Sequence, residues 1–132
     1  MIVAALRSPS GASAALIELA LAGYPTLLAN VALALEYEAV CSRPEHAFAA
    51  GLTDADVEVF VDGVLALVEP VSTHFVWRPQ LRDPSDEMVL EAAVNGRADA
   101  IVTFNVRDFG DAPATFGLHL WLPREALRRS KQ

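Results

Sequence analysis

The stretch ADAIVTFNVRDF at residues 98–109 places a short apolar run directly before a polar segment. Residues 100–104 have the length and composition of a buried β-strand, so the polar side chains follow where that strand ends. In open α/β sheets, ligands bind beyond the carboxyl ends of the strands. We therefore expect Asp108, preceded by Thr103 and Asn105, to lie at a ligand-binding edge. The alternative for Asp108 is an Asx-turn or a loop cap.

Helical and strand patterns alternate on either side of this stretch. The clearest helix is residues 53–68, where apolar residues recur at helical spacing and Thr53 with Asp56 has the pattern of a cap. Strands that alternate with helices predict an α/β fold, with a mainly parallel sheet flanked by helices on both faces. The other predicted helices span residues 12–22, 31–42, 45–50, 84–95 and 123–129, and the predicted strands span 26–29, 71–76, 100–104 and 118–122.

Length and composition limit the classes of protein. A chain of 132 residues fits one domain, residues 1–132, and its apolar content of 53% favours a sheet covered on both faces. The net charge of −7 argues against a broad basic surface that wraps nucleic acid. Any contact with nucleic acid is therefore expected to be local or assisted by a metal ion.

The lack of a recognisable targeting signal and the single cysteine favour a reducing compartment. No apolar run reaches the roughly 18 residues of a membrane helix, and no signal peptide is recognisable, so we expect a cytoplasmic protein that does not enter the membrane. Cys41 is the one cysteine; it cannot form an intramolecular disulfide or make a zinc site by itself. We expect it to be a small buried helix residue.

Glu36 is a carboxylate in an apolar stripe. Leu33, Tyr37 and Val40 define that stripe at helical spacing, and Glu36 falls inside it. A buried ionised carboxylate is costly unless it is paired, hydrogen-bonded or bound to a cation. Glu36 therefore needs a partner from another element. The alternatives are an arginine partner or a position at the rim of the core.

Asp83 and Asp86 begin the helix predicted at residues 84–95. Asp83 has the position of an N-cap, Pro84 that of the first helical residue, and Asp86 that of a first-turn acid favoured by the helix dipole. Capping alone is one explanation of this segment. The other is that Asp86 belongs to a site with acids from other elements.

Acids from three elements suggest a metal site when they are taken together. Magnesium and manganese prefer carboxylate and water oxygens, so Glu36, Asp86 and Asp108 would suffice without histidine or cysteine ligands. Such a site can activate water against a phosphodiester. Without the cation, at least one of the crowded carboxyl groups should have a raised pKa.

In this order and spacing, the motifs resemble the PIN-domain family. The resemblance rests on Glu36 within residues 34–40, on Asp86 within residues 82–86, and on Thr103-x-Asn105-x-x-Asp108-Phe109. It runs over nearly the whole chain. It implies a ribonuclease dependent on Mg²⁺ or Mn²⁺, often the toxin of a toxin-antitoxin pair related to virulence-associated protein C.

The resemblance also assigns roles and partners. RNA would be the substrate, an antitoxin protein a partner, and a homodimer an open alternative to a monomer. The residue roles that it implies are metal-binding and catalytic for Glu36, Asp86 and Asp108, supporting for Asp83, Thr103 and Asn105, and phosphate-binding for Arg82 and Arg107.

One element of the family pattern is missing. PIN domains open with a central strand that ends in Asp immediately before a segment like residues 2–7, yet no acidic residue precedes Glu18. We therefore expect a fold truncated at the first strand and impaired activity. The alternative function is a catalytically inactive PIN-like module that binds RNA or a partner protein. A nucleotide-binding enzyme is disfavoured because neither a Gly-x-Gly-x-x-Gly fingerprint nor a phosphate-binding loop is present.

Overall fold

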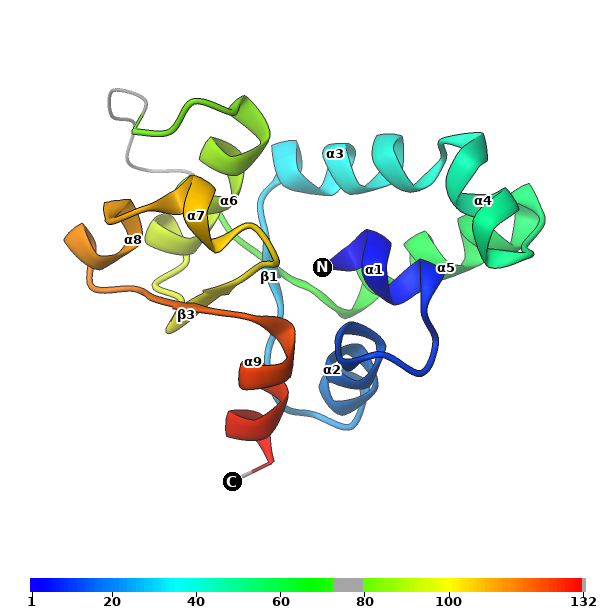
Figure 1. Ribbon diagram of the computed structural model, residues 1–132, viewed down its shortest axis with the longest axis horizontal. Coiled ribbons are helices and arrows are strands. Elements are labelled where there is room, and N and C mark those ends of the chain that lie inside the picture. Colours follow the sequence, from blue (N-terminus) through cyan, green and yellow to red (C-terminus); the bar gives the residue numbers. More distant parts are fainter. Residues whose placement is uncertain (73–79, 132) are drawn as a thin grey trace.

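The computed structural model describes residues 1–72 and 80–131. Within them, helices alternate with four short strands, and most of the predicted elements are confirmed with bounds shifted by a few residues (Figure 1). The strands are β1 (Leu28–Ala29), β2 (Glu69–Pro70), β3 (Ala100–Val102) and β4 (His119–Trp121). The helices are α1 (Ile2–Arg7), α2 (Ala12–Leu21), α3 (Val31–Cys41), α4 (Pro44–Ala50), α5 (Asp54–Leu67), α6 (Pro84–Asn95), α7 (Val106–Phe109), α8 (Ala112–Thr115) and α9 (Pro123–Ser130).

Side-chain hydrogen bonds explain where α5 and α3 begin. The Thr53 hydroxyl accepts a hydrogen bond from the Asp56 N–H at 3.1 Å, and the Asp56 carboxylate accepts one from the Thr53 N–H at 3.0 Å. This reciprocal capping box satisfies two N–H groups at the start of α5, as the sequence predicts. At the start of α3, the buried Asn30 side chain accepts from the Leu33 N–H at 2.8 Å.

The strands are parallel, as predicted, but they form two separate pairs. β1 pairs with β2, and β3 pairs with β4 in the register Ala100 to His119. Among the described residues, no strand joins β1 to β3, so the prediction of one sheet is wrong for this part of the chain. The strands are two or three residues long, and Pro70 has no N–H to extend the first pair.

The strand predicted at Val71–Val76 is displaced. The observed β2 precedes it at Glu69–Pro70, and residues 73–76 lie outside the described residues. Val71 nevertheless donates its N–H to the carbonyl of Ala29 at 2.9 Å, so the chain still follows β1 for one residue beyond β2.

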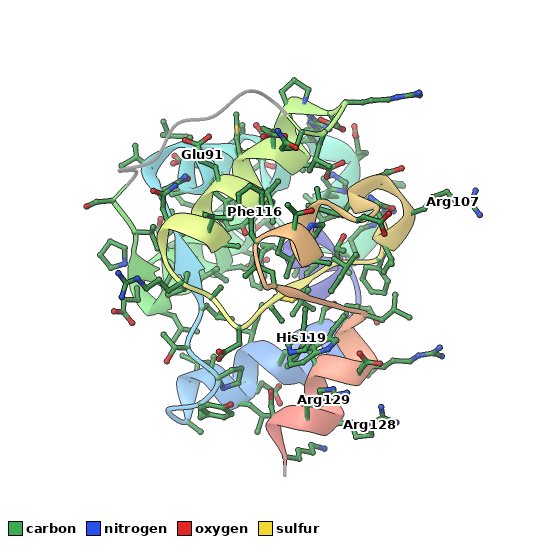
Figure 2. All side chains as sticks on the ribbon, turned by 90° about the vertical axis from the view of Figure 1, so that its left-hand side faces the viewer. Glu91, Arg107, Phe116, His119, Arg128 and Arg129 are labelled. Carbon is green, nitrogen blue, oxygen red and sulfur yellow. The ribbon has the colours of Figure 1, made fainter. Side chains whose placement is uncertain are left out.

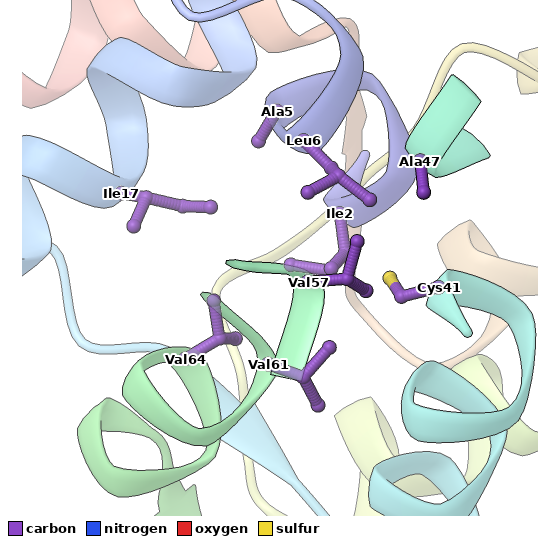
Figure 3. Close-up of a cluster of buried hydrophobic side chains, with 9 residues drawn as sticks. All are labelled: Ile2, Ala5, Leu6, Ile17, Cys41, Ala47, Val57, Val61 and Val64. Carbon is purple, nitrogen blue, oxygen red and sulfur yellow. The ribbon is translucent and has the colours of Figure 1, made fainter. Parts of the chain in front are cut away.

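Of the buried hydrophobic clusters in residues 1–72 and 80–131, the one with the most residues lies among helices α1 to α5. Figure 3 shows these side chains from α1, α2, α3, α4 and α5 pointing toward one another. Cys41 is among them with 1% of its surface exposed, which confirms the prediction of a small buried helix residue. The cluster comprises Ile2, Ala5, Leu6, Ile17, Cys41, Ala47, Val57, Val61 and Val64.

Two further clusters of buried side chains lie on different sides of α6. Leu90 of α6 is fully buried and packs with Ile101 and Phe109 in one cluster. On the other side of α6, Ala92 packs with Leu33 of α3 and Ala29 of β1. Helix α6 is therefore held against α3 on one side and against β3 and α7 on the other.

Gly96 ends α6 for a reason other than backbone freedom. Its φ of −86° is ordinary for any residue. A Cβ atom there would lie 2.7 Å from the Val71 Cγ2 atom and 2.9 Å from the Leu28 Cδ1 atom. A side chain at this position would therefore force Val71 and Leu28 to shift, because the end of α6 packs closely against the segments around β1 and β2.

Candidate active site

The packing of α3 against α6 brings Glu36 to the first turn of α6. Glu36 is partly buried, and its Oε1 atom accepts a hydrogen bond from the Ser85 hydroxyl at 3.1 Å. The partner that the sequence requires for Glu36 is therefore a serine hydroxyl rather than an arginine. A serine donor holds the carboxylate in place but leaves its negative charge uncompensated.

The start of α6 carries both predicted acids. Asp83 is the N-cap, as predicted, and its Oδ1 atom accepts from the Ser85 N–H at 2.9 Å. The Glu87 carboxylate accepts from the N–H groups of Gln80 at 3.0 Å and Leu81 at 2.9 Å, which fixes the segment leading into the helix. Asp86, in the same first turn, accepts no hydrogen bond from any described residue.

Asp108 lies beyond the carboxyl end of β3, where the sequence places it. The Thr103 hydroxyl accepts from the Asn105 N–H at 3.0 Å, and the Asn105 carbonyl accepts from the Asp108 N–H at 3.0 Å. Asp108 is part of the short helix α7, so the alternative of an Asx-turn or a loop cap is wrong. Its carboxylate, like that of Asp86, accepts no hydrogen bond within the described part of the chain.

The carboxylates at the start of α6 interact electrostatically with the Asp108 carboxylate of α7. Burial, followed by the neighbouring carboxylates of Asp83 and Asp108, raises the pKa of Asp86 above its usual range. This is the response predicted for crowded carboxyl groups in the absence of a cation. Asp83, Asp86 and Asp108 therefore share one negative region, and Ser85 connects it to Glu36.

These acids are neighbours but not a closed chelate. Across residues 1–72 and 80–131, no group of three or more His, Cys, Asp or Glu side chains converges closely enough to hold a metal ion. Mg²⁺ is usually bound through one or two carboxylates and keeps several waters. Two carboxylates without hydrogen-bond partners, as found for Asp86 and Asp108, fit that donor set.

The arginines assigned to phosphate lie near this region but are exposed. Arg82 directly precedes the Asp83 cap, and Arg107 precedes Asp108. In Figure 2, the Arg107 side chain extends outward from α7. Neither arginine forms an ion pair with a described carboxylate.

Sequence reasoning missed Ser85. It lies between the two acids of α6 and contacts both Asp83, through its N–H, and Glu36, through its hydroxyl. A serine at the second position of a helix is common for local reasons, so its sequence context gives no sign of a partner 49 residues away.

Short parallel strands, intervening helices and a group of acids at a strand end define this molecule as an α/β domain with an acidic site. Within that class, the chain belongs to the PIN domain family, whose family model matches residues 1–107. The matched range contains Glu36, Asp83 and Asp86 and ends one residue before Asp108. PIN domains are commonly nucleases that depend on divalent metal ions.

Comparisons with curated proteins and with solved structures give no match. None of the helices in residues 1–72 and 80–131 combines the length and the apolar character needed to cross a membrane.

Proposed function

We propose that this chain is a metal-dependent endoribonuclease that hydrolyses phosphodiester bonds with Mg²⁺ or Mn²⁺. The observation that carries the proposal is that the Ser85 hydroxyl binds the Glu36 carboxylate of α3 in the turn that holds Asp86, where burial and then the carboxylates of Asp83 and Asp108 raise the pKa of Asp86. Crowded carboxylates repel one another, and a divalent cation would relieve that repulsion. Membership of a family of metal-dependent nucleases supports the same conclusion.

The proposed metal ligands are Asp86 and Asp108, with Glu36 bound to the ion or to one of its waters. Asp83 is engaged as a helix cap, so we assign it to a supporting position around the site. When bound, the ion would activate a water molecule and stabilise charge on the phosphodiester.

Other side chains would position the ligands and the substrate. Ser85 orients the Glu36 carboxylate through its hydroxyl, and Thr103 with Asn105 fixes the turn that presents Asp108. The exposed guanidinium groups of Arg82 and Arg107 would bind RNA phosphates.

A toxin role is the biological setting that the family resemblance suggests. We propose that the chain acts in the cytoplasm and is neutralised by an antitoxin protein. Expression of the chain should arrest bacterial growth, and co-expression of the product of an adjacent small gene should restore it. Growth arrest that is unchanged in an Asp86→Asn, Asp108→Asn double variant would separate the toxicity from the acidic site.

Cleavage of labelled single-stranded RNA tests the enzymatic proposal. We expect Mn²⁺-dependent cleavage that EDTA abolishes, and at least a 100-fold loss in the Asp86→Asn, Asp108→Asn double variant. The matched control is Asp62→Asn, since Asp62 is an exposed acid on α5 without a hydrogen-bond partner among the described residues. Equal activity in the double variant and the control would exclude the acidic site. Metal-independent RNA binding without cleavage would favour the inactive binding module.

A further inference from the structure

The C-terminal helix is basic in an acidic protein. Residues 123–131 carry four cationic side chains and one carboxylate, whereas the whole chain has a net charge of −7. The cations are Arg124, Arg128, Arg129 and Lys131, and all four are exposed. The segment also lies outside the range matched by the family model, which ends at residue 107. The family match therefore assigns no role to this charge pattern.

The cationic side chains of residues 123–131 form at most weak ion pairs with the carboxylates of the described residues. The Arg128 guanidinium lies 3.9 Å from the Glu125 carboxylate, and 70% of the Arg128 side chain is exposed, so this pair contributes little. Among the described residues, no carboxylate lies within 4.0 Å of the charged groups of Arg124, Arg129 or Lys131. Their charge is available to an anionic ligand.

An aromatic stack lies against the same helix. His119 and Trp121 alternate along β4 and share one face, with ring centroids 5.4 Å apart and planes inclined by 13°. The Arg129 guanidinium carbon lies 4.9 Å from the centre of the Trp121 ring. Figure 2 shows His119, Arg128 and Arg129 gathered in one region of the molecule. The exposed His119 ring therefore stacks on Trp121, and Arg129 of α9 contacts the Trp121 ring.

This basic and aromatic surface begins at the same strand end as the acidic site. β4 is parallel to β3, and the Thr103 N–H donates to the Trp121 carbonyl at 3.0 Å. The segment leading to Asp108 and the start of α9 therefore leave adjacent strands together. A hollow of about 350 Å³ lies at the start of α9, lined by Leu122, Arg124, Glu125 and Arg128.

We propose that β4 and α9 form a binding surface for single-stranded RNA, in which Arg124 and Arg128 bind phosphates and His119 stacks with a base. Nucleic-acid single strands are bound by this combination of cations that follow the backbone and aromatic rings that stack with bases. An acidic protein segment would use the cations but not the stack. The inference deepens the proposed ribonuclease function, since the surface would hold RNA beside the acidic site.

Binding of a fluorescent oligouridine to the full chain in EDTA tests this surface without cleavage. The Arg124→Gln, Arg128→Gln double variant should weaken binding and reduce the slope of log K against log salt by about 1.4, since each phosphate contact on a single strand contributes about 0.7. His119→Ala should weaken binding by about 5- to 150-fold, the range for one stacked base, with an unchanged salt slope. His119→Phe should retain binding.

The control removes the same charge elsewhere. Arg7 and Arg43 are exposed and form no ion pair with a described carboxylate, so Arg7→Gln, Arg43→Gln should leave binding nearly unchanged. Equal weakening in both double variants, or no effect of either, would overturn the proposal. Displacement of the RNA by poly-glutamate at similar concentration, with no effect of His119→Ala, would assign the surface to an acidic protein instead.

Binding and cleavage separate this inference from the nuclease proposal. If RNA binding in EDTA depends on α9 but the acid variants do not change cleavage, the RNA surface stands and the proposed catalytic site fails. If the acid variants abolish cleavage but the α9 variants bind RNA normally, the RNA surface is wrong. Equal melting temperatures of the variants and the wild type would exclude unfolding as the cause.

Discussion

Replacement of Asp86 by Asn should stabilise the metal-free protein at neutral pH. Burial and the carboxylates of Asp83 and Asp108 raise the pKa of Asp86, so its ionised form is disfavoured in the folded state. A group with a raised pKa contributes fully to the stability of the folded state when the pH is below its pKa in the unfolded chain, near 3.8. That contribution is lost as the pH rises through its pKa in the folded state. At pH 7 the ionised Asp86 therefore destabilises the fold, and Asn removes that charge.

The expected gain in stability from Asp86→Asn is small because two effects oppose each other. Asp86 is only partly buried, so solvent screening should limit the gain in the free energy of unfolding to less than about 1 kcal/mol. A negative charge in the first turn of α6 also gains about 0.3–1 kcal/mol from the helix dipole, which Asn gives up. Burial raises the pKa of Asp86 and the carboxylates of Asp83 and Asp108 act in the same direction, so we expect removal of the charge to outweigh the lost dipole interaction. We expect a rise of roughly 1–4 °C in melting temperature.

Thermal melting in EDTA from pH 7 down to pH 4 measures this effect. The difference between Asp86→Asn and wild type should shrink as the pH falls, because wild-type Asp86 becomes protonated. Added Mn²⁺ should reverse the order at pH 7, because binding to the folded wild type stabilises it by about 2.7 kcal/mol at 100 times the Kd. The Asp62→Asn control should show neither response. A lower melting temperature for Asp86→Asn at pH 7 in EDTA would mean that the Asp86 charge does not destabilise the metal-free fold.

Three further predictions concern packing, capping and positioning. Gly96→Ala should lower the free energy of unfolding, measured by thermal melting, by about 1–3 kcal/mol because the added Cβ would clash with the segments around β1 and β2. Gly63→Ala lies in open space on α5 and should raise it by about 0.5–1 kcal/mol. Equal effects at both glycines would contradict the close packing. Thr53→Ala should cost about 1 kcal/mol in urea unfolding through loss of the α5 capping box. Ser85→Ala should lower Mn²⁺-dependent cleavage while leaving RNA binding in EDTA unchanged, since Ser85 orients Glu36; a parallel loss of both would indicate a purely structural role.

Local signals explain what could be predicted of the fold. The start of α5 follows from the Thr53 and Asp56 pair, and the start of α6 follows from Asp83 and Pro84. These features act over three or four residues, so they are visible in the sequence. The strands were harder to place, because β1 and β2 contain two residues each and β2 includes Pro70, which a strand pattern disfavours.

Long-range contacts explain what the sequence could not supply about the site. The sequence singles out Glu36 as a costly carboxylate, but its Ser85 partner depends on how α3 packs against α6. Similarly, the alternation of His119 and Trp121 is visible in the sequence, while the contact of Arg129 with that stack depends on the path of α9. The placement of Asp108 beyond a strand end was predictable because it follows from chain order within an α/β fold.

Anomalous diffraction from a crystal of the full chain soaked in Mn²⁺ would show whether acids from α3, α6 and α7 hold one divalent ion, as we propose. We expect a manganese peak coordinated by Asp86 and Asp108, with Glu36 bound to the ion or to one of its waters. That peak should be lost in the Asp86→Asn, Asp108→Asn variant. A peak at other residues, or the same peak in the double variant, would contradict the proposal.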